Sequence, residues 1–246
     1  MSAKPRVLVI QHDPISPLGA LSEHFAADGI SPTVIEPNRG DSFANLDAFD
    51  ILVLLGGQME AWQEQEHPWL VPEKAAIRRW VNNLDKPLLG ICLGHQILAD
   101  ALGGRVDRAQ QGEAALTRIA LTEAGQGHPI YAGFGTSKAA ISWHGSEVTA
   151  LPPKATLLGN TSDCAISSFS VGSAAIGVQY HVEATGNQTD EWAETQNGAK
   201  HLVGLHGAAN VPRVHKAIAD AKPELRNNSE RFYRNFMALA QQTLAR

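Results

Sequence analysis

The first half of the chain alternates short, continuously apolar runs with amphipathic stretches. The runs are rich in Val, Ile and Leu and are bounded by polar residues or glycine, which is typical of strands buried on both faces. They lie at residues 6–10, 33–36, 51–55 and 87–91. Between them, apolar residues recur at helical spacing over 16–28, after Pro72 and over 94–102. This alternation predicts a parallel sheet covered by helices on both faces.

The pattern changes after Gly104. Shorter apolar runs predict further strands at 116–121, 139–142, 155–158, 165–169 and 174–180, and these are expected to add antiparallel strands to the sheet. Beyond Glu183 the chain is polar and helical, with a last helix over 229–244. We therefore expect one α/β domain over 1–246, a three-layer sandwich with a mostly parallel, mixed central sheet. Its core covers 1–185 and a helical extension covers 186–246.

Composition excludes several classes of function. The net charge is −5, from 20 Lys plus Arg against 25 Asp plus Glu, which argues against a nucleic-acid or anionic-membrane surface. No apolar stretch has the length of a membrane span, and the start of the chain lacks a secretory pattern. The two cysteines, Cys92 and Cys164, favour a reducing, cytoplasmic setting. We expect neither a bound metal nor a cofactor.

Cys92 stands in a pattern that suits a nucleophile. It follows a predicted buried strand, precedes a predicted helix, and has Gly90 and Gly94 two residues to either side. Such small neighbours permit a tight strand-to-helix turn. The helix N-terminus favours a thiolate, and the Leu93 N–H can face a developing oxyanion. The alternative is an inert buried cysteine, which is how we interpret Cys164, because it lacks the glycines and the helix.

His181 and Glu183 can supply the partners of a nucleophile. If 177–183 is extended, the two side chains lie on the same face, because strand side chains alternate with period two. A carboxylate beside an imidazole fixes its tautomer and stabilises the imidazolium. Together with a glycine-flanked cysteine, the pair predicts a Cys-His-Glu triad.

Three motifs resemble those of the class I (triad) glutamine amidotransferase family. They are Gly56-Gly57-Gln58, Gly90-Ile91-Cys92-Leu93-Gly94-His95-Gln96 and Val178-Gln179-Tyr180-His181-Val182-Glu183. The resemblance implies that family's flavodoxin-like fold and hydrolysis of a γ-glutamyl amide through a γ-glutamyl thioester. Cys92 would then be the nucleophile, His181 the base and Glu183 its partner.

The same resemblance implies the remaining site residues. The N–H groups of Gly57 and Leu93 would form the oxyanion hole. The substrate-binding residues would be Gly56, Gln58, Gln96, Trp143, His144 and Gly145. The chain departs from the family pattern at Gln58 and Val182, where proline is usual, and at Ser146, where aspartate is common.

Three functions remain open. The chain can be a free-standing hydrolase of γ-glutamyl amides, a glutaminase subunit that supplies ammonia to a synthase partner, or a non-catalytic γ-glutamyl-binding module. We favour the hydrolase, because the C-terminal helices and a loop with Trp62 and Trp69 can enclose a small-molecule substrate. We interpret His201 and His206 as solvated helix residues, since no further metal ligands accompany them.

Overall fold

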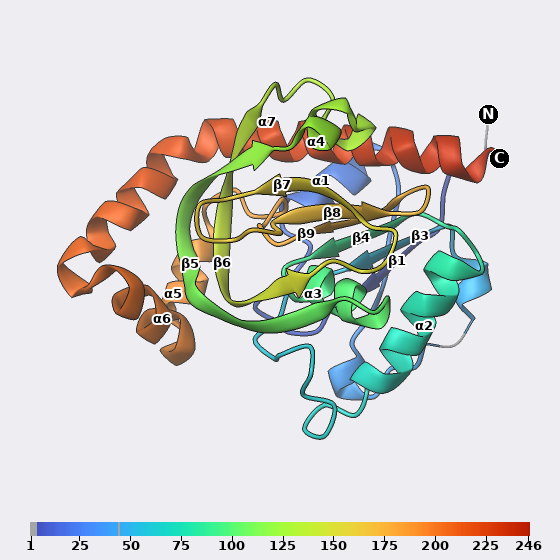
Figure 1. Ribbon diagram of the computed structural model, residues 1–246, viewed down its shortest axis with the longest axis horizontal. Coiled ribbons are helices and arrows are strands. Elements are labelled where there is room, and N and C mark those ends of the chain that lie inside the picture. Colours follow the sequence, from blue (N-terminus) through green and yellow to red (C-terminus); the bar gives the residue numbers. More distant parts are fainter. Residues whose placement is uncertain (1–3, 44) are drawn as a thin grey trace.

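The computed structural model describes residues 4–43 and 45–246, which form a nine-stranded sheet in the order β2-β1-β3-β4-β9-β8-β7-β5-β6 (Figure 1). Five neighbouring strands are parallel: β2 (Thr33–Ile35), β1 (Val7–Ile10), β3 (Ile51–Leu54), β4 (Leu88–Ile91) and β9 (Ala175–Val178). Every residue of β1, β3, β4 and β9 is buried, as their uninterrupted apolar runs predict.

The other strands pair antiparallel, so the prediction of a mixed sheet is confirmed. They are β8 (Ser168–Val171), β7 (Thr156–Asn160), β5 (Arg105–Leu121) and β6 (Ser137–Ala150). The expectation that the run 174–180 adds an antiparallel strand is wrong with respect to the central sheet, because β9 lies parallel beside β4 and pairs antiparallel only with β8. The predictions for β5 and β6 were too short. The first half of β5 is mostly polar and exposed and carries an irregularity between Arg108 and Glu113, so its sequence shows no strand periodicity.

Helices cover both faces of the sheet. In Figure 1, α1 (Ala20–Ala27) and α7 (Val211–Leu244) lie above it, and α2 (Leu70–Asn82) and α3 (Leu93–Ala101) lie below it. Alternate residues of β1 enter two separate cores. Val9 packs in one core with Phe25 and Phe232, whereas Leu8 packs in the other with Trp80. These burials are the main source of stability, at about 1.5–3 kcal/mol for each large apolar side chain.

The chain after β9 forms helices α5 (Gln188–Glu194), α6 (Gln196–His206) and α7, while the short helix α4 (Glu123–Gly127) follows β5. The predicted last helix, 229–244, is too short, since α7 begins at Val211 and continues through Pro223. None of the described helices is both long and apolar enough to cross a membrane.

Candidate active site

Cys92 lies at the sharp turn between β4 and α3. Its φ is 52° and its ψ −108°, a backbone conformation that non-glycine residues rarely adopt and that costs about 1–3 kcal/mol. A Cβ on Gly90 would lie 2.6 Å from the Gly94 carbonyl oxygen, and a Cβ on Gly94 would collide with the backbone of Leu54. Both glycines are therefore required for this turn, which aims Cys92 into a pocket.

His181 and Glu183 form a buried pair beside Cys92. His181 Nδ1 lies 2.6 Å from Glu183 Oε1, and the side chains are 4% and 2% exposed. The expected extended segment 177–183 is wrong in its length, because β9 ends at Val178 and His181 forms only an isolated bridge to Ile141. The two side chains meet nonetheless. The backbone N–H of His181 donates to the Ile141 carbonyl at 2.8 Å.

The other ring nitrogen of His181, Nε2, has no hydrogen-bond partner among the described residues. Burial lowers the pKa of His181, but the charges of Glu183 and Cys92 outweigh it and hold the pKa well above its usual value. Trp192 of α5 packs on the imidazole, with ring centroids 4.5 Å apart. In the sequence, Trp192 stands out only as an apolar anchor of a helix, and nothing there indicates this contact.

Cys92 and His181 line one pocket of about 170 Å³. This volume is below the range of about 300–1,000 Å³ that is typical of sites for drug-sized ligands, and so suits a single small group. The pocket includes these predicted site residues: Gly57, Gln58, Cys92, Gln96, Trp143, His144, Gly145 and His181.

The pocket lining does not include three other predicted site residues, Gly56, Leu93 and Glu183. A Cβ on Gly56 would lie 3.5 Å from His181 Cε1, and a Cβ on Gly57 would lie 2.9 Å from Leu93 Cδ2. The Gly56–Gly57 turn, the start of α3 and His181 are therefore in close contact. Gly57 and Leu93 are therefore neighbours, and their role as oxyanion donors stays a prediction.

A buried pair that the sequence did not reveal supports this turn. His12 Nε2 lies 2.8 Å from Glu73 Oε1, and His12 Nδ1 lies 2.9 Å from the Leu55 carbonyl oxygen. Burial lowers the pKa of His12, but Glu73 outweighs it and the pKa is raised. A Cβ on Gly57 would also meet His12, at 3.2 Å from its Cβ. His12 and Glu73 come from distant segments, so only the fold brings them together.

Gln96 joins α3 to strand β6. Its side-chain nitrogen donates to the Ser146 carbonyl at 2.8 Å and to Gln179 Oε1 at 3.0 Å. Cys92 Sγ lies 3.8 Å from the Trp143 carbonyl oxygen. These contacts hold the segment Trp143–Ser146 against the cysteine turn. A direct contact of Gln96 with substrate stays a prediction.

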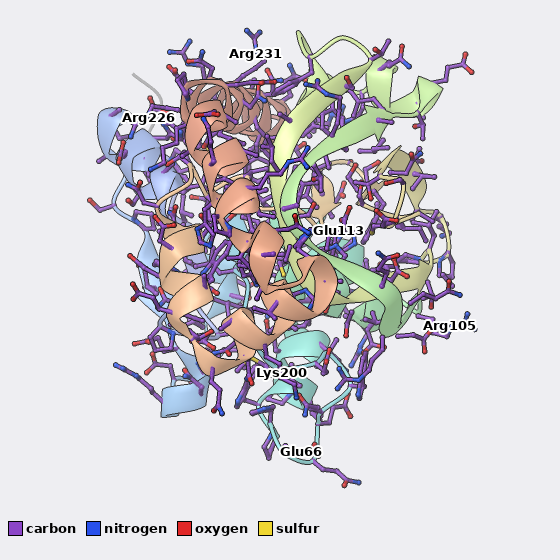
Figure 2. The ribbon with its side chains drawn as sticks, turned by 90° about the vertical axis from the view of Figure 1, so that its left-hand side faces the viewer. Glu66, Arg105, Glu113, Lys200, Arg226 and Arg231 are labelled. Atoms are coloured by element: carbon purple, nitrogen blue, oxygen red, sulfur yellow. The ribbon has the colours of Figure 1, made fainter. Side chains whose placement is uncertain are left out.

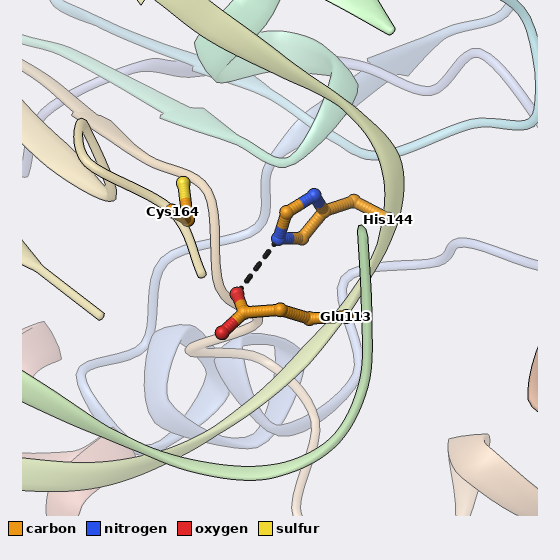
Figure 3. Close-up of side chains that lie close together, drawn as sticks. All are labelled: Glu113, His144 and Cys164. Carbon is orange, nitrogen blue, oxygen red and sulfur yellow. Dashed lines mark hydrogen bonds and ion pairs between the residues drawn. The ribbon is translucent and has the colours of Figure 1, made fainter. Parts of the chain in front are cut away.

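A second set of the same residue types lies beside the pocket (Figure 3). Glu113 Oε2 bonds to His144 Nε2 at 2.8 Å, and His144 Nδ1 donates to the Ser146 carbonyl at 3.0 Å. Thr161 donates to the other Glu113 oxygen at 2.7 Å. Cys164 is fully buried, as expected, and burial first, with Glu113 second, raises its pKa.

Glu113, His144 and Cys164 offer atoms within 4.8 Å of one another that a metal could use. The carboxylate and the imidazole, however, already bond to each other, and each has a further partner. We therefore interpret this set as a hydrogen-bonded support of the pocket wall.

The C-terminal helices cover the pocket. Figure 2 shows α5 and α6 in front of the strand that carries Glu113. Trp192, Thr195, Asn197, Gly198 and His201 all line the pocket.

Two expectations about the surroundings of the pocket were wrong. His201 and His206 are not solvated helix residues, because α6 folds back on β5. Their Nε2 atoms lie 3.1 Å from the Glu113 carbonyl oxygen and 3.0 Å from the Ala114 carbonyl oxygen, respectively. Nor do Trp62 and Trp69 belong to the pocket lining. Trp62 is 42% exposed, and Trp69 stacks on His12 instead.

Comparison with known proteins agrees with this geometry. The profile of the family "Glutamine amidotransferase class-I" matches residues 18–197. The chain belongs to this family. Within it, the chain is 30% identical to the glutamine amidotransferase-like protein YfeJ of Salmonella typhimurium, over 73% of the chain and 76% of the relative.

Two further relatives of this class-I amidotransferase carry different names. Gamma-glutamyl peptidase 3 of Arabidopsis thaliana is 32% identical, over 56% of each chain. A glutamine-hydrolysing GMP synthase subunit of Sulfolobus acidocaldarius is 30% identical, over 63% of this chain and 77% of the relative.

Solved structures agree in fold. A glutamine amidotransferase from Thermotoga maritima is 25% identical with a TM-score of 0.81, over 94% of this chain and 97% of that one. A glutamine amidotransferase from Methylobacillus flagellatus is 24% identical with a TM-score of 0.84, over 97% and 96%. At 24% identity, the similarity to the Methylobacillus structure shows a shared fold and nothing further.

Proposed function

We propose that this class-I amidotransferase hydrolyses a γ-glutamyl amide bond, with Cys92 as nucleophile, His181 as general base and acid, and Glu183 orienting His181. The observation that carries the proposal is that His181 lines the same pocket as Cys92 and that its Nε2 has no hydrogen-bond partner among the described residues. A buried imidazole with one nitrogen on a carboxylate and the other unpartnered is arranged to exchange a proton with a neighbouring group.

In the first half of the reaction, Cys92 Sγ, as thiolate, attacks the γ-carbonyl carbon of the substrate. The carbonyl oxygen becomes an oxyanion, and the N–H groups of Gly57 and Leu93 stabilise it. The protonated Nε2 of His181 then gives its proton to the departing nitrogen. The C–N bond breaks, and an amine or ammonia leaves behind a γ-glutamyl thioester on Cys92.

In the second half, neutral His181 takes a proton from water, and the resulting hydroxide attacks the thioester carbon. The C–S bond breaks, glutamate is released and the thiolate forms again. Glu183 stabilises the imidazolium in both halves, in keeping with the raised pKa of His181. The small pocket suits the γ-glutamyl group.

The leaving group separates two forms of this function. A free-standing hydrolase, as the name of the Arabidopsis relative suggests, releases an amine or amino acid from a γ-glutamyl compound. A glutaminase subunit, as the name of the Sulfolobus relative suggests, supplies ammonia to a synthase. We favour the hydrolase, because α5 and α6 of the same chain cover the pocket where a subunit would need an open docking face.

The test is glutamate release by the purified protein alone, from L-glutamine and from a panel of γ-glutamyl-amines and γ-glutamyl peptides. The Cys92→Ala variant is the blank. We expect turnover of at least one γ-glutamyl-amine or peptide, faster than that of glutamine. Release from glutamine alone would favour the subunit, and no release from any compound would point to a subunit that needs its synthase partner.

A further inference from the structure

The pocket has one built-in negative charge that the proposed reaction does not use. Among the described residues that line it, Glu60 is the sole carboxylate. It stands three residues after Gly57, in the loop that leads from β3 to α2. Its side chain is only 16% exposed, so its charge is poorly screened by solvent.

Neighbouring groups hold this carboxylate in place. The Ser146 hydroxyl donates to Glu60 Oε2 at 2.6 Å, and Arg108 Nη1 lies 3.1 Å from Oε1. The Glu60 N–H donates to Gln63 Oε1 at 2.7 Å. A carboxylate has about four lone-pair sites, so Glu60 retains acceptor capacity after these two partners. Arg108 is 74% exposed, and such a pair contributes little by itself.

The γ-glutamyl group carries an ammonium group on its α-carbon, away from the bond that breaks. An ammonium entering a small pocket loses water and needs a charged acceptor there. We propose that Glu60 binds the α-ammonium group of the γ-glutamyl substrate and so selects donors whose α-amino group is free. This inference rests on the proposed function. The Ser146 hydroxyl then positions the carboxylate through its hydrogen bond to Oε2.

Selectivity follows from this contact. A substrate whose α-amino group is acylated or missing leaves Glu60 without its cation, and it binds more weakly by about 10- to 100-fold. The effect falls on binding, because Glu60 is bonded to Ser146 and Arg108 and not to the proposed reacting groups. A purely structural Glu60 would instead affect all substrates alike.

The rate of alkylation of Cys92 tests this without any need for turnover. Two electrophiles are compared, a chloromethyl ketone analogue of glutamine and the same compound without its α-amino group. We expect the wild-type protein to react about 10- to 100-fold faster with the first. Glu60→Gln should abolish this preference. Glu66→Gln, the same change at the exposed tip of the same loop, should preserve it (Figure 2).

Two results would overturn the proposal: a wild-type protein that does not prefer the amino-bearing reagent, or a Glu60→Gln variant that slows with both reagents equally. The conservative variant Glu60→Asp should retain more of the preference than Glu60→Gln, and equal preferences would also contradict it. If the wild-type protein hydrolyses no γ-glutamyl compound, the proposed function fails while the alkylation rates still decide the role of Glu60. With a hydrolysed substrate, Glu60→Gln should raise KM about 10- to 100-fold and change kcat less than about threefold.

Discussion

The molecule contains two sets of cysteine, histidine and glutamate, and the two sets differ in how far their side-chain atoms are already hydrogen-bonded. In the set of Cys92, His181 and Glu183, one imidazole nitrogen is bonded to the carboxylate and the other has no partner among the described residues. In the set of Cys164, His144 and Glu113, both imidazole nitrogens and both carboxylate oxygens are bonded.

The two cysteines differ in the same way. Cys92 stands at the start of a helix in a left-handed turn and lines the pocket. Cys164 is fully buried, and burial raises its pKa away from the thiolate form. Residue types alone therefore do not make a nucleophile. A free hydrogen-bonding atom, a helix N-terminus and access to a pocket are the features that separate the two sets.

The largest effect should come from His181→Ala. Removing the proposed base leaves no group to carry the proton, and kcat/KM for glutamate release should fall at least about a thousandfold. His206→Ala, which removes a histidine of α6 that bonds to the Ala114 carbonyl, is the matched control and should retain activity. A His181→Ala variant with a tenth or more of wild-type activity would contradict the assignment.

A smaller loss is expected for Glu183→Gln, by about a hundredfold in kcat, because the imidazolium loses its carboxylate. The pKa of His181, measured by NMR titration, should fall. Because this pKa is raised in the folded protein, the pair's contribution to stability is present below about pH 6.5 and is lost as pH rises through the raised value. An unchanged His181 titration would show that Glu183 does not act on it.

In the second set, Glu113→Gln should affect stability more than chemistry. The free energy of unfolding at neutral pH should fall by about 1–3 kcal/mol, measured by denaturant titration. Burial raises the Glu113 pKa, but its bond to His144 outweighs this and the pKa is lowered. The contribution is therefore present above the usual glutamate pKa of about 4.3 and is lost as pH falls through the lowered value, the reverse of the His181 pair.

Exposed Glu66→Gln is the control for the Glu113 measurement and should leave the unfolding free energy unchanged. A stability loss from Glu113→Gln that grew at acid pH would mean that the ionised carboxylate is not the stabilising form.

Cys164→Ser should have the smallest effect. Glutamate release should stay within about twofold of wild type, and the unfolding free energy should fall by about 1 kcal/mol, because a buried thiol is replaced by a more polar hydroxyl. Cys92→Ser makes the same chemical change in the first set and should lose nearly all activity. Equal losses in the two variants would remove the distinction between the sets.

The sequence predicted the first set better than the second for a physical reason. Gly90, Cys92 and Gly94 are neighbours in the chain, and so are His181 and Glu183, so their geometry has a local signature. Glu113 and His144 are 31 residues apart and meet only because β5 and β6 pair. The roles of His12 and Trp192 likewise depend on contacts between distant segments.

In the fold too, elements with a local sequence signal were predicted better than elements without one. The central strands were predicted from continuous apolar runs, whereas the polar half of β5 and the first part of α7 lacked such a signal. The sequence does not indicate Glu60 either, since only the fold brings it to Ser146, 86 residues away, and into the pocket lining.

The most direct measurement is the identity of the cysteine that takes up a reactive analogue of glutamine. The native protein is treated with the chloromethyl ketone analogue until glutamate release stops, and the labelled peptide is identified by mass spectrometry. We predict one adduct per chain, on Cys92, formed in step with the loss of activity. An adduct on Cys164, or glutamate release that persists after Cys92 is fully labelled, would contradict the account.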